Sequence, residues 1–265
     1  MNILVIGDIY GQIGRNILEE YLESLRKDYQ IDFVIVNGEN ISHGKSMIKE
    51  HYHFLKRINV DVITGGNHTF DKPDMLDLIV DNDDILRPLN SNPYHPGKGS
   101  SIFTIKDKKI RVTNLIGSAF MGSSQNPYFE MDTLLKEDDS DIHLVDCHAE
   151  ASAEKIALAW NYDGKITALW GTHTHVQTND ARILPKETGF ITDIGMTGAY
   201  YSIIGANPTE VIYRQKNNLP IKFKPAIGEG QINGIVLFID DITNKVIKIE
   251  NININPHKEY PKVIK

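Results

Sequence analysis

The strongest constraint on the fold is an alternation of short β-branched apolar runs with amphipathic segments in the first half of the chain. The runs Ile3–Ile6, Phe33–Val36 and Val60–Thr64 have the length and composition of buried strands. Helix-like segments follow each run, at Ile17–Leu25, Ile48–Ile58 and Met75–Val80. This alternation predicts βαβ units, and therefore a parallel sheet with helices on its faces.

The second half of the sequence predicts a second group of strands. Ser101–Ile105 and Ile110–Leu115 flank Asp107-Lys-Lys in the manner of a hairpin. Further strands are predicted at Ile85–Leu89, Ile142–Cys147, Ile166–Trp170 and Gly189–Ile194. One helix is predicted at Ala151–Trp160, and Ile232–Ile239 and Val246–Ile252 are predicted to form a final hairpin. The sequence has no internal repeat, low-complexity tract or linker, so we expect one domain, 1–265, with two mixed sheets covered by helices.

Composition narrows the classes of function and location. The chain has 28 Lys and Arg against 35 Asp and Glu, a net charge of −7, which argues against an extensive nucleic-acid surface. The single cysteine, Cys147, excludes an intrachain disulfide and fits a reducing compartment. Met1–Asp8 is apolar for too few residues to form a signal sequence, and no stretch approaches the roughly 20 apolar residues of a membrane span. We therefore expect a cytoplasmic protein without membrane contact.

Residue types that bind metals follow five of the predicted strands, at the point where each strand ends. These residues are Asp8, Glu39, Asn40, Asn67, His68, His148, His173 and His175. Ligands in open α/β sheets collect at the carboxyl ends of strands. In an extended segment, His173 and His175 would point to the same side. Carboxylate, amide and imidazole donors without sulfur suit Fe, Mn or Zn better than Cu(I), Ca or Mg.

The number of candidate ligands favours two ions over one. Seven residues, all of this set except His68, are too many for one open site, but they suffice for two ions roughly 3.5–4 Å apart with a bridging carboxylate. Two divalent ions bring four positive charges, whereas Asp8 and Glu39 return only two negative charges. The remaining positive charge favours an anionic phosphate and a bridging hydroxide at neutral pH.

Each residue taken singly has a simpler explanation. Asp8 alone would be a turn or helix-capping residue, and Asn40 or Asn67 alone would be a turn residue. His148 alone would be a core histidine with a satisfied hydrogen bond. Their joint placement at strand ends favours metal binding. The segment 7–14 has three glycines but not the G-x-G-x-x-G spacing, so dinucleotide binding is rejected.

The order and spacing of these motifs resemble those of calcineurin-like metallophosphoesterases. The motifs are Gly7-Asp8, Gly38-Glu39-Asn40, Gly66-Asn67-His68, His148 and Gly171-Thr-His-Thr-His175. Over most of the chain the resemblance extends to one branch, the YmdB-like phosphodiesterases, through Gly7-Asp-Ile-Tyr-Gly11, Val36-Asn-Gly-Glu-Asn40, Gly66-Asn-His-Thr-Phe-Asp71 and Cys147-His-Ala-Glu-Ala151. Tyr10 stands where the superfamily usually has a histidine, and Glu39 replaces an aspartate; both departures are similar to that branch.

The resemblance implies an α/β fold, a four-layer α/β/β/α sandwich of two mixed sheets flanked by helices, with the site at the edge of both sheets. It implies that one ion is bound by Asp8, Glu39, Asn40 and His175. It implies that the other is bound by Glu39, Asn67, His148 and His173. Glu39 would bridge the ions, and His68 would be the catalytic histidine that follows the ligand Asn67.

The implied activity is metal-dependent hydrolysis of phosphodiesters, with 2′,3′-cyclic nucleotides as the substrate class. The nucleophile would be a hydroxide that bridges the ions, and His68 would protonate the departing ribose oxygen. One alternative is a phosphomonoesterase or 5′-nucleotidase on the same metal core, and another is a nucleotide- or RNA-binding regulator with weak activity. The expected partner is a small phosphodiester, an RNA-derived substrate is a further candidate, and assembly into a homo-oligomer is compatible with the sequence.

Overall fold

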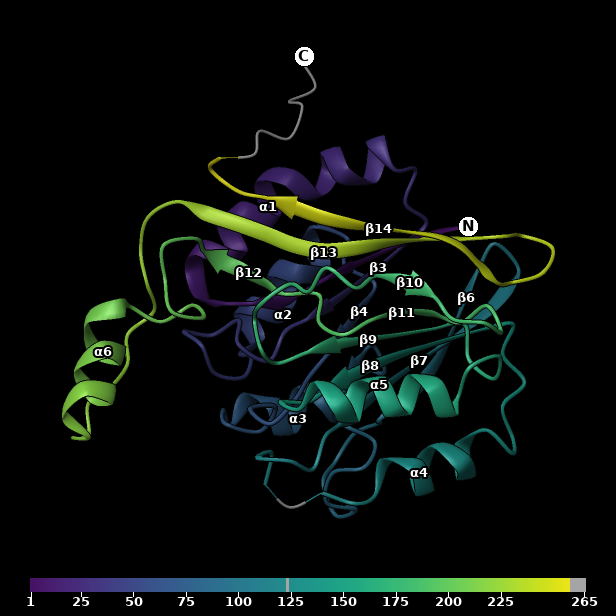
Figure 1. Cartoon of the computed structure of the whole chain (residues 1–265), viewed down its shortest axis with the longest axis horizontal. Coiled ribbons are helices and arrows are strands. Elements are labelled where there is room, and N and C mark those ends of the chain that lie inside the picture. The colour runs from purple at the N-terminus through teal and green to yellow at the C-terminus, as the bar shows by residue number, and fades with distance from the viewer. Residues whose placement is uncertain (123, 258–265) are drawn as a thin grey trace.

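The computed structural model describes residues 1–122 and 124–257 (Figure 1). Two mixed β-sheets stack face to face, and helices cover the outer face of each sheet (Figure 1). The predicted four-layer α/β/β/α sandwich is therefore confirmed.

The first sheet has eight strands. They are β1 (Asn2–Ile6), β2 (Asp8–Ile9), β3 (Phe33–Asn37), β4 (Val62–Thr64), β5 (Ile85–Leu86), β12 (Met196–Ala199), β13 (Gly230–Ile239) and β14 (Val246–Ile254). The order is β2-β12-β13-β1-β3-β4-β5, and β14 pairs with β13 on the side opposite β1. Strands β1, β3, β4 and β5 are parallel, so their carboxyl ends lie at one edge of the sheet.

The second sheet has six strands in the order β10-β11-β9-β8-β7-β6. Their bounds are β6 (Ser100–Ile105), β7 (Lys108–Ile116), β8 (Ile142–His148), β9 (Ala168–Thr172), β10 (Arg182–Ile183) and β11 (Gly189–Ile191). The four central strands are parallel, and β6 and β10 run antiparallel at the two edges. The β6–β7 hairpin and the β13–β14 hairpin are both as predicted.

Three apolar layers hold the sandwich together. Helices α1 (Gly11–Asp28), α2 (Lys49–Arg57) and α3 (Asp74–Asp81) pack on the outer face of the first sheet. The core between the sheets includes Phe33 and Trp170, and α4 (Pro127–Leu134) and α5 (Ser152–Asn161) cover the second sheet. Within the described ranges, no helix combines the length and apolar composition needed to cross a membrane.

Two helices were not predicted, and both begin at the same dipeptide. Asn126 precedes Pro127 at the start of α4, and its side chain accepts a hydrogen bond from the Tyr128 backbone. Asn207 precedes Pro208 at the start of α6 (Pro208–Asn217). Proline is favoured in the first turn of a helix because its missing N–H would have no helical partner there. The Asn-Pro pairs are therefore the sequence features that could have revealed both helices.

Candidate metal centre

Three of the predicted ligands surround the ring of a fourth, His148, which ends β8 and is fully buried. Its Nε2 atom lies 3.0 Å from Glu39 Oε1, 3.1 Å from Asn67 Oδ1 and 3.0 Å from His173 Nδ1. Glu39 and Asn67 follow β3 and β4 of the first sheet, whereas His173 follows β9 of the second. The strand ends of both sheets therefore converge on one point.

Hydrogen bonding alone does not explain this cluster. An imidazole nitrogen carries at most one hydrogen, yet three electronegative atoms surround His148 Nε2 at hydrogen-bond distance. Ligand atoms bound to one transition metal at about 2.1 Å and at right angles would lie about 3 Å apart. The ligand atoms of Glu39, His148 and His173 all lie within 4.8 Å of one another. The arrangement fits a metal ion.

A second group of predicted ligands surrounds the ring of His175. Its Nε2 atom lies 3.2 Å from Asn40 Oδ1 and 3.6 Å from Asp8 Oδ1, while its Nδ1 donates to the backbone oxygen of Ile204 at 2.8 Å. The Asn40 side-chain NH₂ donates to Gly44 O, and this hydrogen bond turns the Asn40 side-chain oxygen toward His175. Asp8 is fully buried, and its Oδ1 has no hydrogen-bond partner among the described residues. A buried carboxylate oxygen without a hydrogen bond is costly, and a bound cation would satisfy it.

The electrostatics of the two groups suit cation binding. Burial would raise the pKa of Asp8, but the contacts with His175, the charge of His148 and the His173 backbone together outweigh burial and bring the pKa to about 2. Burial, reinforced by the charge of His148, lowers the pKa of His173 to about 4, so its ring is neutral at pH 7. Burial opposes a charged His148, but Glu39 together with the charges of Asp8 and Asp146 outweighs burial and raises the pKa of His148. Metal binding would displace the proton that His148 and Glu39 otherwise share.

The backbone at the site is shaped for close approach. A Cβ atom on Gly66 would lie 2.2 Å from Glu39 Oε2 and 2.3 Å from His148 Nε2, so only glycine fits there. The prediction that His173 and His175 share one side of an extended segment is wrong. Strand β9 ends at Thr172, and the two histidines have φ angles of +95° and +64°, in the left-handed region. The resulting turn sends one ring to each group, and such strained backbone is typical of functional sites.

His68 lies beside the cluster rather than within it. Its backbone N–H donates to Glu39 Oε2 at 2.9 Å, and its Nδ1 lies 2.9 Å from Asp71 Oδ2. Lys45 Nζ is 3.5 Å from the same Asp71 oxygen. The His68 side chain is 33% exposed, so its ring can meet a molecule that enters from solvent. Because Asp71 holds Nδ1–H, Nε2 is the nitrogen available for proton transfer.

Two residues that sequence reasoning missed hold the His148 ring. Thr172 Oγ1 donates to Asp146 Oδ1 at 2.7 Å and lies 2.9 Å from His148 Nδ1. The hydroxyl hydrogen is given to Asp146, so its oxygen accepts from Nδ1–H, and Nε2 is left to face the cluster. Asp146 also accepts from Thr64 Oγ1 of the first sheet. Alternation along β8 places Asp146 on the same face as His148, which is the feature that could have revealed it.

A buried ion pair supports the turn that carries the two histidines. Lys155 Nζ of α5 lies 2.7 Å from Asp193 Oδ2, and both side chains are almost completely buried. The same Asp193 oxygen accepts from the Thr174 backbone N–H at 3.3 Å, between His173 and His175. Burial raises the pKa of Asp193 even though Lys155 opposes the shift. The pair therefore anchors this turn to α5.

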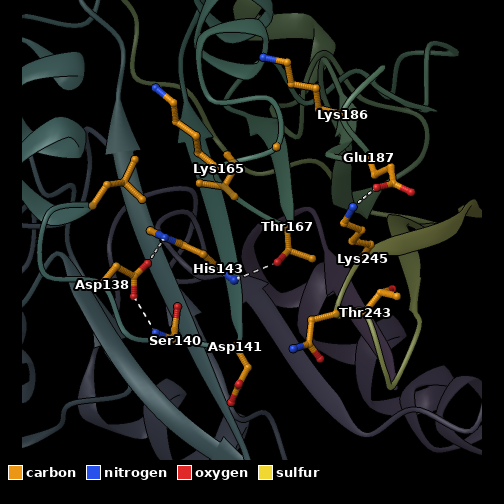
Figure 2. A pocket seen from close by; sticks show the side chains of 14 residues that line it. Asp138, Ser140, Asp141, His143, Lys165, Thr167, Lys186, Glu187, Thr243 and Lys245 are labelled. Carbon is orange, nitrogen blue, oxygen red and sulfur yellow. Dashed lines mark hydrogen bonds and ion pairs between the residues drawn. The ribbon is translucent and has the colours of Figure 1, made fainter.

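A cavity of about 400 Å³ lies at the other end of the second sheet (Figure 2). Residues near the amino ends of β8 and β9 line it, including His143 and Lys165, and none of the eight predicted site residues is among them. His143 Nδ1 faces Asp138 Oδ2 at 2.6 Å (Figure 2). This cavity is therefore separate from the metal-binding cluster.

Comparison with known proteins agrees with the resemblance seen in the sequence. Residues 4–252 match the family model described as YmdB-like protein. The 2′,3′-cyclic-nucleotide 2′-phosphodiesterase of Bacillus subtilis (strain 168) is 44% identical over 257 residues, which cover 96% of this chain and 97% of that protein. The match covers nearly the whole length of both proteins, so the similarity extends well beyond the candidate metal-binding motifs.

Solved structures show the same fold. A crystal structure of a phosphatase from Mycoplasma pneumoniae is 40% identical, has a TM-score of 0.93 and covers 96% of this chain and 93% of its own. A 5′-nucleotidase precursor from Thermus thermophilus is 11% identical, with a TM-score of 0.54 over 97% of this chain and 55% of its own, and shows the fold alone. From its family match and its similarity to the Bacillus protein, the chain belongs to the YmdB-like family.

Proposed function

We propose that this chain is a metal-dependent phosphodiesterase that hydrolyses 2′,3′-cyclic nucleotides at a dinuclear site. The observation that carries the proposal is the convergence of three ligand atoms on His148 Nε2 beside a second group around His175. The name of the B. subtilis relative, which is similar over nearly the whole chain, gives this substrate class.

The two ions would divide the ligands as the family resemblance implies. One ion would be held by Asp8, Glu39, Asn40 and His175, and the other by Glu39, Asn67, His148 and His173. Glu39 would be shared between them. Oxygen and nitrogen donors without sulfur suit Fe or Mn, and Zn is also compatible. When bound, the ions would supply an activated water nucleophile and neutralise charge on the phosphoryl oxygens.

His68 has the position required of a proton donor. Its contact with Asp71 orients the ring, while its backbone bond to Glu39 keeps it next to the ligands. The departing ribose oxygen is a poor leaving group unless it is protonated, and His68 Nε2 would supply that proton. General-acid assistance of this kind is typically worth about 10²–10⁴ in rate.

A second candidate is a phosphomonoesterase on the same ligands, because the similar M. pneumoniae protein is described as a phosphatase. The third, a nucleotide- or RNA-binding regulator, is less favoured because seven candidate ligands are arranged around two centres and His68 lies beside them.

A substrate panel separates these functions. Metal-free protein would be supplied with Mn²⁺ and assayed on 2′,3′-cyclic AMP, bis-nitrophenyl phosphate and nitrophenyl phosphate. We expect hydrolysis of both diesters to exceed that of the monoester. A higher rate on the monoester would favour the phosphomonoesterase, and nucleotide binding without metal-dependent turnover would favour the regulator.

A further inference from the structure

Residues 208–227 form an arm that leaves the body of the molecule. Helix α6 begins the arm and stands clear of the two sheets (Figure 1). Every residue from 212 to 224 is exposed to solvent. A segment of this length without burial contributes little to the core, so its side chains are available for an interaction.

The arm is basic although the chain as a whole is acidic. It carries Arg214, Lys216, Lys222 and Lys224 against a single acidic residue, Glu210. Its net charge is therefore +3, which leaves −10 on the rest of the chain. The overall charge of −7 conceals this local concentration, which suits a polyanion.

Aromatic side chains lie among the basic residues of the arm. Tyr213 and Phe223 are 43% and 39% exposed. The Arg214 guanidinium lies 5.3 Å from the centre of the Phe223 ring. Exposed rings interleaved with cations are characteristic of surfaces that bind single-stranded nucleic acid, because bases stack on the rings while the cations contact phosphates.

The base of the arm is connected to the metal-binding cluster. Asn207 N donates to Lys224 O at 2.8 Å, and Ala226 N donates to Gly205 O at 2.9 Å. Ile204, next to Gly205, accepts the bond from His175 Nδ1 at 2.8 Å. A polynucleotide whose terminus occupied the cluster would therefore lie near the arm. Helix α6 has 10 residues, about 15 Å, which matches about four stacked nucleotides.

We propose that the arm binds single-stranded RNA whose 3′-terminal 2′,3′-cyclic phosphate occupies the metal site. This inference rests on the proposed function and deepens it, since it makes an oligonucleotide the substrate in place of a free mononucleotide. In the reaction, water adds to phosphorus, one P–O bond of the ring breaks, and the departing ribose oxygen takes a proton. The product is an RNA with a terminal phosphomonoester.

The test compares two substrates in the presence of Mn²⁺. They are 2′,3′-cyclic AMP and an adenylate decamer that ends in a 2′,3′-cyclic phosphate. We expect kcat/KM to be at least tenfold higher for the decamer at 50 mM salt in the wild-type protein. The variant R214Q/K216Q/K222Q/K224Q should lose that preference. If all four charges contact phosphates, raising the salt to 200 mM should weaken binding of the decamer to the arm by up to roughly 50-fold, so the wild-type preference should fall toward one.

A matched control removes four charges from the other end of the second sheet. The variant K136Q/K165Q/K186Q/K245Q includes three lysines that line the cavity of Figure 2. It should keep the preference for the decamer, because these residues lie away from the site. The ratio of the two kcat/KM values is the readout, since a damaged metal site would lower both values together.

Other outcomes overturn the inference in distinguishable ways. Equal kcat/KM values for the two substrates, or a preference that survives in the arm variant, would reject it and leave the proposed function standing. Absence of turnover on both substrates would reject the proposed function and the inference with it. If sedimentation shows that the arm variant loses self-association while its preference is retained, the arm is a contact between copies of this chain.

Discussion

His148 Nε2 lies 3.0 Å from Glu39 Oε1, and this contact joins the two sheets at their carboxyl edge. Glu39 follows β3 of the first sheet, and His148 ends β8 of the second. Asp146, two residues earlier on β8, makes a second connection to the first sheet through Thr64. The ligand geometry therefore depends on how the sheets are stacked, which is set by the apolar core between them.

Replacing His68 by alanine should separate catalysis from metal binding. We expect His68→Ala to keep its metal and to lose about 10²–10⁴ in kcat, because the ring contacts Asp71 rather than the ligand cluster. Asp71→Asn should lose less, since the histidine remains. Elemental analysis and kcat are measured on the same preparations. A metal-free His68→Ala protein would instead make His68 a ligand.

Removing the Thr172 hydroxyl should weaken metal binding. In Thr172→Val the side chain keeps its shape, but His148 Nδ1 loses its acceptor. Loss of such an orienting contact typically lowers metal affinity 10–100-fold. Competition with a coloured chelator measures the affinity, and Thr172→Ser, which retains the hydroxyl, serves as the control. Equal affinities in all three proteins would show that Thr172 does not orient His148.

Breaking the buried Lys155–Asp193 pair should destabilise the fold. Lys155→Met leaves a buried carboxylate without its cation, which should cost about 3–5 kcal/mol in the free energy of unfolding. Lys27→Met, which breaks an exposed pair with Glu23, should cost less than about 1 kcal/mol. Urea denaturation measures both. A loss as small as that of Lys27→Met would contradict the anchoring role of the buried pair.

Asp138 should make stability sensitive to acid. Burial opposes its charge, but hydrogen bonds from His143 and Arg111 outweigh burial and hold its pKa well below the usual value of about 3.9. A lowered pKa in the folded state gives stability that is fully present above about pH 4 and is lost as pH falls toward the folded pKa. Asp138→Asn should therefore be less stable at pH 7, and its stability should fall less between pH 4 and pH 2.

Urea denaturation at several pH values checks this prediction. The difference in the free energy of unfolding between wild type and Asp138→Asn should narrow as the pH falls. A difference that stays constant from pH 7 to pH 2 would show that the Asp138 carboxylate does not contribute through its charge.

The candidate metal-binding cluster could largely be predicted from the sequence because apolar runs end abruptly in glycine and polar residues, as at Gly38-Glu39-Asn40. Parallel βαβ order then brings these ends to one edge. The contact between Thr172 and His148 was not visible, because it depends on the register that pairs these residues between β8 and β9. The turn at His173 and His175 was also missed, since positive φ angles at non-glycine residues are set by surrounding structure.

The arm also has features that the sequence predicts and features that only the fold reveals. Its basic and aromatic residues, from Tyr213 to Lys224, could be read in the sequence, but the net charge of the chain pointed away from nucleic acid. What the sequence did not show is that the base of the arm meets the backbone next to the partner of His175. This proximity results from backbone hydrogen bonds between the segments before and after α6, which local composition does not determine.

The proposed dinuclear site is tested most directly by titrating metal-free protein with Mn²⁺ while hydrolysis of 2′,3′-cyclic AMP is followed. We predict that turnover is absent without metal and rises until two equivalents are bound per chain. Turnover that is complete at one equivalent, or that does not depend on added metal, would contradict a mechanism that needs both ligand groups, the one around His148 and the one around His175.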